Sequence, residues 1–431
     1  MQKKLAQELL DFINNSPTAF HATKTAVDIL EKEGFKKLEN NKKWDLVAGN
    51  KYYVEKNKSA FIAFAVGTGD ISNNGFKVVG AHTDSPCFKI KPKCEISVEN
   101  SYIKLNTEGY GGAILSTWFD RPLSIAGRVV LKGESPLKPK QKLININKPI
   151  LIIPNMAIHM NRSVNEGYAI NKQKDTLPLA ALVNEKLESN DYLVNTICRE
   201  LNVSKKDILD FDLFLYEYEK GSLAGFNEEF ISCSRLDDLW MVFAGVKSLS
   251  NSNISKYTNV LICTDNEEIG SFTEGGADSS FVSSVFERIA LSLGCSKEEY
   301  YMALSNSIVM SADLAHALHP NNTEKHDLTN RPVLGKGPVL KIAASGSYST
   351  NAVSGAIFKE VCNNASIPYQ TFVNRSDMRG GTTIGPMMSS HFSVPVIDMG
   401  TPILAMHSIR ELASVKDNEY VNKLFNEFYN M

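Results

Sequence analysis

A histidine and an aspartate two residues apart follow an apolar run of the chain. Residues 77–86 read Lys-Val-Val-Gly-Ala-His-Thr-Asp-Ser-Pro, so His82 and Asp84 stand at the end of a predicted buried strand. On an extended backbone, residues two apart point to the same side, roughly 6.5–7 Å from one another. A metal-binding histidine usually has a carboxylate or carbonyl that orients its second ring nitrogen, and Asp84 is placed for that role. The alternative is a structural histidine at a strand end, hydrogen-bonded to an aspartate of the turn.

A second apolar run ends in a cluster of carboxylates. Residues 260–270 read Val-Leu-Ile-Cys-Thr-Asp-Asn-Glu-Glu-Ile-Gly, which places Glu267 and Glu268 just after the run. Open α/β sheets carry their sites at the carboxyl ends of the strands, so this turn is a candidate site. Two adjacent glutamates in a loop can divide the work, with one binding a cation and the other moving a proton. A solvated acidic turn is the alternative.

Three further segments add carboxylates and a second histidine. Asp313 ends a third apolar run, Asp237 and Asp238 stand at the entry to a predicted helix, and His407 follows the run 394–399. Each signal is weak by itself. Together, two histidines and at least four carboxylates at strand edges of one sheet suit two divalent ions with nitrogen and oxygen ligands and a shared bridging carboxylate.

The elements that would position these residues alternate strands with helices. Helical spacing of apolar residues over 3–34 predicts two helices, and short strand-like runs follow them. Between about residues 91 and 227, short strand-like pieces stand among Pro-, Lys- and Asn-rich connectors, which indicates a β-rich insertion. We therefore predict an α/β fold, a sheet flanked by helices, interrupted by a β-rich domain. The predicted boundaries are 1–92 and 230–431 for the α/β domain and 93–229 for the insertion.

The composition excludes several classes of protein. Of the 431 residues, 43% are hydrophobic and 22% charged, as in ordinary globular proteins. The 46 basic and 48 acidic residues give a formal charge of −2, so no net field would attract nucleic acid. Apolar runs fall well short of the roughly 18 residues of a membrane span. Seven scattered cysteines without a Cys-X-X-Cys pair indicate buried reduced thiols, and the first twelve residues indicate an amphipathic helix, so we expect a cytoplasmic protein.

Two other motifs have simpler structural interpretations. His316 and His319 stand three apart but lack the His-Glu-X-X-His pattern of zinc peptidases, so we interpret them as helix-end packing. The segment Gly-Tyr-Gly-Gly at 109–112 lacks the strand–turn–helix context and terminal Lys-Ser/Thr of a phosphate loop. We therefore predict no nucleotide site there.

Six segments, in order along the chain, form a recognisable set. They are Gly-Ala-His-Thr-Asp-Ser-Pro (80–86), Tyr-Gly-Gly with Ser-Thr-Trp-Phe-Asp-Arg (110–121), Asn-Glu-Glu-Ile-Gly-Ser (266–271), Ser-Ala-Asp-Leu-Ala-His-Ala-Leu-His-Pro (311–320), Gly-Gly-Thr-Thr-Ile-Gly-Pro (380–386) and Leu-Ala-Met-His-Ser-Ile-Arg-Glu (404–411). Together they resemble the aspartyl aminopeptidase family of metallopeptidases. The resemblance implies an α/β fold with a zinc-peptidase sheet flanked by helices, which carries two zinc ions and is interrupted by a β-rich dimerisation and oligomerisation domain. It also implies a tetrahedral dodecamer whose sites face an internal chamber and remove amino-terminal residues, commonly Asp or Glu, from peptides with a free amino terminus.

The resemblance implies a role for each matching position. His82 and Asp313 match ligands of one zinc, Asp237 matches the bridging ligand, and Glu268 and His407 match ligands of the second zinc.

The same resemblance supplies the catalytic groups. Glu267 matches the general base and Asp84 the carboxylate that supports His82, while Asp238 stands where the family usually has Asn. Water that bridges two zinc ions becomes acidic enough to ionise near neutral pH. Glu267 would accept its proton and deliver it to the leaving amine.

Three residues could recognise an acidic substrate side chain. His159 matches a histidine of the insertion that reaches a neighbouring subunit's pocket, although a direct metal ligand is the alternative. Lys341 and Arg379 could add positive charge. Ser347 stands where many relatives have arginine, and Arg379-Gly380 where they have Pro-Cys. Neutral residues are therefore the alternative substrates, and a di-metal deacylase on the same scaffold is the alternative enzyme.

Overall fold

The computed structural model describes residues 2–183 and 191–431 and divides into two compact units. Unit 1 comprises Met1–Asp84, Gly221–Met406 and Glu411–Met431, and unit 2 comprises Ser85–Lys220 and His407–Arg410. We predicted an insertion over 93–229, of which 184–190 lie outside the described residues. Unit 2 instead starts at Ser85 and stops at Lys220, because the next strand on each side of these limits belongs to a different sheet.

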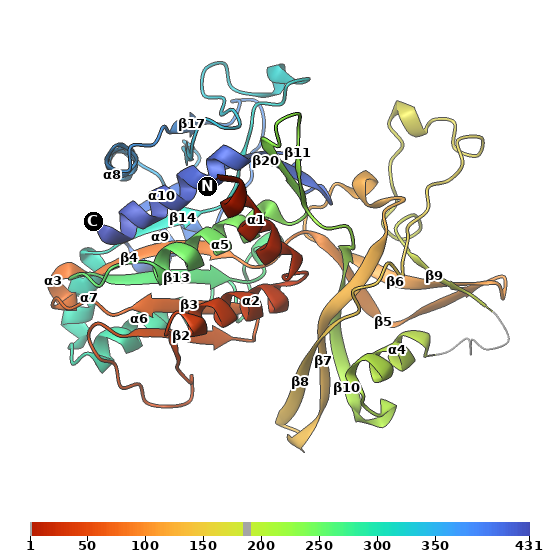
Figure 1. The fold of residues 1–431 in the computed structure, drawn as a ribbon, viewed down its shortest axis with the longest axis horizontal. Coiled ribbons are helices and arrows are strands. Elements are labelled where there is room, and N and C mark those ends of the chain that lie inside the picture. The colour runs from red at the N-terminus through yellow and green to blue at the C-terminus, as the bar shows by residue number, and fades with distance from the viewer. Residues whose placement is uncertain (1, 184–190) are drawn as a thin grey trace. The chain divides into compact units, whose positions relative to one another are not determined.

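Unit 1 is built on a nine-stranded sheet (Figure 1). Its strand order is β1-β2-β3-β13-β4-β14-β18-β16-β17, and β13, β4, β14 and β18 are parallel neighbours. Parallel strands covered on both faces are apolar along their whole length, and every residue of β4 and β13 is buried. The strands are β1 (Lys36–Lys37), β2 (Lys51–Lys56), β3 (Ala60–Ala65), β4 (Phe76–His82), β13 (Thr258–Thr264), β14 (Ile308–Ala312), β16 (Val339–Lys341), β17 (Gln370–Phe372) and β18 (Val396–Gly400).

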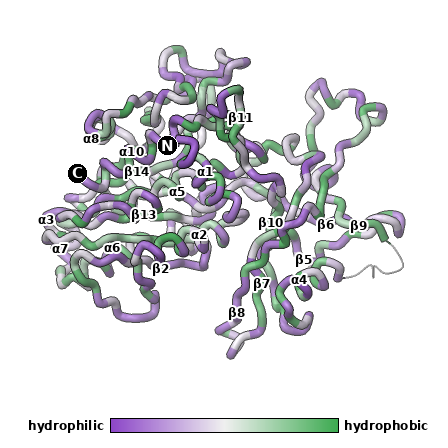
Figure 2. The backbone as a smooth tube through the Cα atoms, viewed as in Figure 1, coloured by the Kyte–Doolittle hydropathy of each residue, from purple (hydrophilic) through white to green (hydrophobic). Residues whose placement is uncertain are grey.

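The two faces of this sheet pack into different apolar clusters. Val79 and Leu261 belong to one cluster, and their neighbours Val78 and Val260 belong to the other, as the period of two along a strand requires. The apolar character of these strands can be followed along the backbone in Figure 2. The first cluster takes in α1 (Gln2–Asn14), α2 (Ala19–Lys32), α5 (Leu236–Ser250), α8 (Ala352–Asn364) and α10 (Val415–Asn430), and the second α3 (Ile71–Asn74), α6 (Ser280–Ser292), α7 (Lys297–Ser305) and α9 (Gly385–Phe392).

A smaller sheet continues unit 1 beyond the carboxyl ends of two of these strands. Its order is β11-β12-β20-β19-β15, and β15 and β19 directly follow β14 and β18 in the chain. The strands are β11 (Ser222–Ala224), β12 (Phe230–Cys233), β15 (Ala315–His316), β19 (Pro402–Leu404) and β20 (Glu411–Ser414).

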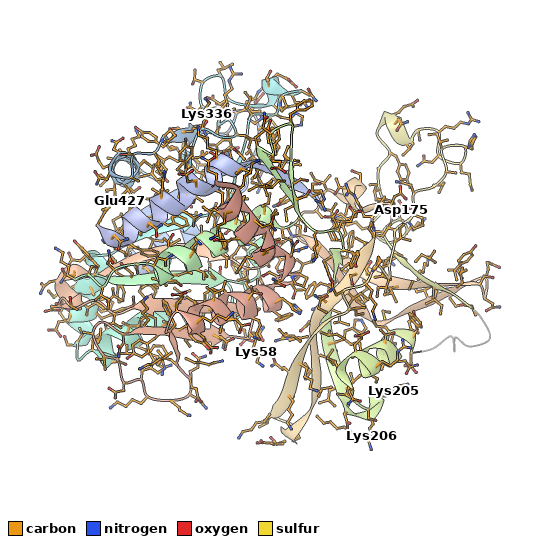
Figure 3. The ribbon with its side chains drawn as sticks, in the orientation of Figure 1. Lys58, Asp175, Lys205, Lys206, Lys336 and Glu427 are labelled. Atoms are coloured by element: carbon orange, nitrogen blue, oxygen red, sulfur yellow. The ribbon has the colours of Figure 1, made fainter. Side chains whose placement is uncertain are left out.

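Unit 2 is an antiparallel six-stranded sheet of order β8-β7-β10-β5-β6-β9, and its described residues also form the α-helix α4. Its core includes Phe88 and Trp118, whose rings meet edge to face at 5.0 Å. Lys205 and Lys206, labelled in Figure 3, lie among its exposed side chains. The elements are β5 (Cys87–Val98), β6 (Tyr102–Tyr110), β7 (Leu123–Ser135), β8 (Lys138–Asn145), β9 (Leu179–Leu182), α4 (Tyr192–Leu201) and β10 (Ile208–Glu217).

The mixed α/β class predicted from the sequence is confirmed. The two helices predicted over 3–34 are α1 and α2, and the apolar runs before His82 and Glu267 are β4 and β13. The helix-end prediction for His316 and His319 is wrong, because His316 lies in strand β15 (Ala315–His316) and His319 in the irregular segment that follows it. Within the described ranges, we find no helix that is both long and apolar enough to cross a membrane.

Candidate metal centre

The carboxyl ends of three parallel strands bring the predicted site residues together. β4 ends at His82, β13 at Thr264 and β14 at Ala312, and His82 is paired with Thr264 in the ladder. Because neighbouring parallel strands end at one edge, the residues that follow them share that edge. Asp84, Glu267 and Asp313 all come within three residues of a strand end.

His82 lies at the centre of this group and is buried. Its Nε2 is 3.5 Å from Asp237 Oδ1 and 4.0 Å from both Asp238 Oδ2 and Asp313 Oδ1. Its other ring nitrogen, Nδ1, is 3.1 Å from the carbonyl oxygen of Asp84 and 3.4 Å from Asp84 Oδ1. One ring nitrogen therefore faces three carboxylates, while Asp84 contacts the other.

Asp84 also holds the turn that carries Glu267 and Glu268, which we call the glutamate turn. Its Oδ1 accepts the backbone N–H of Glu267 and its Oδ2 that of Glu268, each at 3.1 Å. The turn itself needs a left-handed residue at Asn266, with φ of 65°, and a glycine at 270, with φ of 99°. Asp84 therefore connects the histidine of β4 to both glutamates that follow β13.

Asp237 and Asp238 enter the site from the start of α5, where both have non-helical backbone angles and a cis peptide bond joins them. The N–H of Asp237 donates to Glu411 Oε2 at 3.1 Å, and the N–H of His82 donates to Asp238 Oδ2 at 3.1 Å. Asp238 is fully buried, and its Oδ1 accepts no hydrogen bond from the described residues. Our sequence reasoning assigned no role to Asp238, although its place beside Asp237 was the available signal.

Lys341, at the end of β16, forms a buried ion pair with Asp313. Its Nζ lies 3.2 Å from Asp313 Oδ2 and 5.5 Å from the centre of the Tyr348 ring, and the Lys341 side chain is only 3% exposed. Burial alone would lower the pKa of Lys341, but Asp313 raises it above its usual range. This lysine is therefore a fixed positive charge next to one predicted metal ligand.

The crowding of carboxylates changes the acidity of the site. Burial raises the pKa of Glu267 to about 7, although the His82 ring opposes that rise. Burial likewise raises the pKa of Asp238 and of Asp313. Burial would lower the pKa of His82, but Asp238, Asp237 and Asp84 together raise it well above its usual range. Negative groups thus outnumber positive ones at this edge, which favours a bound cation.

The donor set fits zinc. Ligand atoms of His82, Asp237, Asp238 and Asp313 all lie within 4.8 Å of one another. Those of His82, Glu267 and Glu268 form a second such group, and Asp237 and Glu268 lie within the same distance of each other. Imidazole nitrogen and carboxylate oxygen bind Zn²⁺ at about 2.0–2.2 Å, so atoms this close together can share one ion.

His407 belongs to the short segment that groups with unit 2. Its Nδ1 is 3.2 Å from the carbonyl oxygen of Gly112, and its own carbonyl accepts the N–H of Ile114 at 2.9 Å. Three residues later, Arg410 pairs with the buried carboxylate of Glu217, at 3.1 Å between Nη2 and Oε2. Unit 2 therefore holds the segment that carries this predicted ligand.

The other two residues predicted to contact substrate lie on exposed segments. Arg379 is exposed between β17 and α9 of unit 1, and His159 is exposed between β8 and β9 of unit 2.

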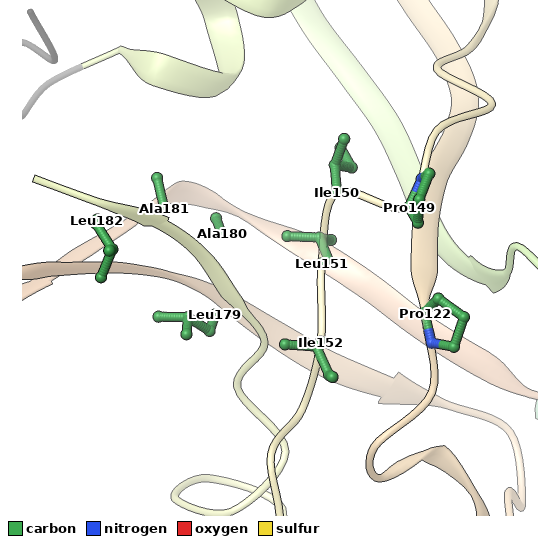
Figure 4. A pocket seen from close by; sticks show the side chains of 9 residues that line it. All are labelled: Pro122, Pro149, Ile150, Leu151, Ile152, Leu179, Ala180, Ala181 and Leu182. Carbon is green, nitrogen blue, oxygen red and sulfur yellow. The ribbon is translucent and has the colours of Figure 1, made fainter.

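Unit 2 also has an apolar groove, with a volume of about 360 Å³ (Figure 4). Ile152 and Leu182 are two of its exposed lining residues. The full lining is Pro122, Pro149, Ile150, Leu151, Ile152, Leu179, Ala180, Ala181 and Leu182.

Comparison with known proteins shows the family to which the chain belongs. The profile of the family described as aminopeptidase I zinc metalloprotease, peptidase M18, matches residues 12–429. A probable M18 family aminopeptidase 2 of Clostridium novyi is 58% identical over 428 residues, 99% of each chain. The chain therefore belongs to the M18 family of zinc aminopeptidases.

Solved structures show the same fold. A chain of the cryo-EM structure of the Ape4 and Nbr1 complex is 36% identical, with a TM-score of 0.95 over 99% of this chain and 86% of that one. The mApe1 dodecamer of S. cerevesiae is 28% identical, with a TM-score of 0.86 over 98% of this chain and 96% of that one.

Proposed function

We propose that this M18 aminopeptidase works with two zinc ions and prefers peptides that begin with Asp or Glu. The observation that carries the proposal is the group of His82 with three carboxylates, those of Asp237, Asp238 and Asp313, at one sheet edge. His82 and Asp313 would hold the first ion, Glu268 and His407 the second, and Asp237 both. Bound zinc supplies Lewis-acid polarisation of the scissile carbonyl and acidifies a water molecule.

The remaining chemistry falls to side chains of this chain. Glu267 is the general base: its carboxylate takes a proton from the attacking water and passes it to the leaving amine. Asp84 holds Glu267 in place through the backbone N–H and keeps the imidazole of His82 oriented. Lys341 balances the charge of Asp313.

An acidic substrate side chain would be met by positive groups. Arg379, Lys341 and His159 are the proposed donors, with His159 supplied by a neighbouring subunit. A pocket built for a charged partner discriminates strongly, because a neutral side chain leaves its donors unpaired. The alternative function, cleavage of neutral residues, is favoured by the ion pair of Lys341 with Asp313 and by the exposure of Arg379, which leave no buried unpaired cation among these two donors.

A panel of aminoacyl anilides, with and without chelator, tests this function. We expect chelator to abolish cleavage, and acidic substrates to be cleaved at least about tenfold better than leucyl ones. Equal or better cleavage of leucyl substrates would refute the acidic pocket and leave the metal chemistry standing. Activity on acyl amino acids, with none on peptides that have a free amine, would identify a deacylase.

The working unit is proposed to be a homo-dodecamer located in the cytoplasm. The yeast relative assembles as a dodecamer, and the apolar groove of unit 2 offers surface that a second copy would cover. Light scattering at micromolar concentration should give a mass near twelve subunits. A monomer would contradict this and would remove the role of His159 in another subunit.

A further inference from the structure

A buried aspartate outside the metal centre lies beneath two loops of unit 1. Asp398, on β18, is 0% exposed and stands opposite Ser311 of β14, two residues before Asp313. Burying a carboxylate is costly unless hydrogen bonds compensate for the lost water. The bonds that Asp398 makes therefore indicate what it holds.

The two carboxylate oxygens of Asp398 bind one loop each. The N–H of Ser349 donates to Oδ2 at 2.5 Å, and the hydroxyl of Thr383 donates to Oδ1 at 2.6 Å. The N–H of Asp398 donates to Thr350 Oγ1 at 2.8 Å. Asp398 thus ties the loop between β16 and α8, and the loop between β17 and α9, to the central sheet.

These two loops adjoin the proposed substrate pocket, because the first follows Lys341 directly and the second carries Arg379. Tyr348 directly precedes Ser349 and packs against Lys341, while Arg379 stands four residues before Thr383. The loops are also joined to each other, because the hydroxyl of Thr382 donates to the carbonyl of Ser347 at 3.2 Å. A change at Asp398 would therefore move both loops.

The start of α9 is built around this carboxylate. A Cβ added at Gly385 would lie 2.2 Å from Oδ1 and 2.4 Å from Oδ2 of Asp398, so only glycine allows the close approach. Burial raises the pKa of Asp398, while the bonds from Thr383 and Ser349 lower it.

We propose that Asp398 is a positioning residue for substrate binding, because its carboxylate anchors both the loop that packs Tyr348 against Lys341 and the loop that carries Arg379. The inference rests on the proposed function in one respect, the placement of these loops at the substrate. It does not depend on which amino-terminal residue is preferred.

The test is Asp398→Asn, assayed on the aminoacyl anilide that the wild-type enzyme cleaves best. Asparagine keeps the shape but removes the charge: the N–H of Ser349 then faces a neutral acceptor, and the Thr383 hydroxyl must reverse from donor to acceptor, so both anchoring hydrogen bonds weaken. We expect KM to rise at least about tenfold, with kcat within about threefold and zinc content unchanged. Trypsin should also cut faster after Arg375 or Arg379, a readout that needs no catalysis.

Asp417→Asn is the matched control. Asp417 is equally buried and accepts two backbone N–H groups, from Gly335 at 2.6 Å and Gly337 at 2.9 Å, but it binds neither loop. Its KM should equal that of wild type. An unchanged KM in Asp398→Asn would overturn the proposal, as would a fall in kcat with loss of zinc, since Asp398 would then act through Asp313.

A second pair of variants decides the matter if Asp398→Asn does not fold. Thr383→Val removes the hydroxyl donor and should raise KM at least about threefold, whereas Thr383→Ser keeps the donor and should restore it. Equal KM values for the two variants would overturn the proposal. If wild type cleaves no acidic anilide but does cleave neutral ones, the acidic preference fails, while the KM comparison remains valid on the neutral substrate.

Discussion

Two regions of unit 1 are built in opposite ways. One is the sheet edge that carries the predicted metal ligands, which we call the metal edge, and the other is the pair of loops 342–350 and 373–384. At the metal edge, His82, Asp237 and Asp238 are buried, and their backbones continue directly from regular strands or a helix. The loops 342–350 and 373–384 have few regular elements, and Arg379 is exposed. His82, Asp237 and Asp238 thus lie on the rigid scaffold, whereas two of the three residues proposed to choose the substrate, His159 and Arg379, lie on loops.

We therefore expect variants at the strand ends to change the rate of the reaction, and variants in the loops to change substrate specificity. Strand ends hold side chains precisely enough for metal binding and proton transfer, whereas loops tolerate substitution. Lys341, the third residue proposed to choose the substrate, differs from the other two because it lies at the end of β16, directly before the first loop, and is buried against Asp313. Variants in the two regions should therefore fail in different ways.

The largest effect is expected at the general base. Glu267→Gln should lower kcat at least about a hundredfold, because the amide cannot accept a proton, while the zinc ligands remain. Metal analysis should find wild-type zinc content. By contrast, the variants of two proposed zinc ligands, Glu268→Gln and His407→Ala, should lose zinc and activity together. Wild-type turnover in Glu267→Gln would remove the base assignment.

A smaller loss is expected at the residue that holds the glutamate turn. Asp84→Asn leaves one of the Glu267 and Glu268 N–H groups facing an N–H₂ group, and a lost hydrogen bond to a charged group is worth about 1.5–3 kcal/mol. That corresponds to roughly a 10–100-fold lower kcat.

Asp327→Asn is the control for Asp84. Asp327 Oδ1 accepts two backbone N–H groups, from Thr329 at 3.1 Å and Asn330 at 2.8 Å, in an exposed turn. This variant should keep full activity. Equal behaviour of the two variants would show that the glutamate turn does not need Asp84.

Variants of the two proposed cationic residues, Arg379 and Lys341, should differ in their effect on substrate preference. Arg379→Ala should reduce the preference for acidic over leucyl anilides by about tenfold and leave leucyl cleavage intact. Lys341→Met should instead impair both substrates, because it leaves Asp313 buried without its partner, a change that costs about 3–5 kcal/mol. The ratio of kcat/KM for the two substrates measures the difference. Loss of preference in Lys341→Met alone would place the specificity on the scaffold.

The same contrast between strand ends and loops explains which residues of the site could be predicted from the sequence. His82, Glu267 and Asp313 follow apolar runs, and parallel strands put their ends together whatever the loops do, so this part of the site followed from local patterns and topology. The role of Lys341 did not, because its partner Asp313 is 28 residues away and only the folded sheet joins them. The hydrogen bonds of Asp398 with Ser349 and Thr383 could likewise not be predicted, because no spacing or motif in the sequence indicates them.

The smallest expected effect concerns Asp417, a buried carboxylate that belongs to neither region and shows what burial does by itself. Burial raises its pKa to about 7, although the N–H groups of Gly335 and Gly337 oppose the rise. In the unfolded chain its pKa is near 3.9, so between about pH 4 and pH 7 the folded state holds the proton more tightly. The stability that this proton provides is fully present below about pH 4 and is lost as pH rises through 7.

Asp417→Asn removes this titration, so the wild-type melting temperature minus that of the variant should fall by a few degrees between pH 5 and pH 8.5. Thermal scans of both proteins at one heating rate measure the difference, in which other titrating groups cancel. A difference that stays constant with pH would show that Asp417 is ionised throughout, held by its two backbone donors despite its burial.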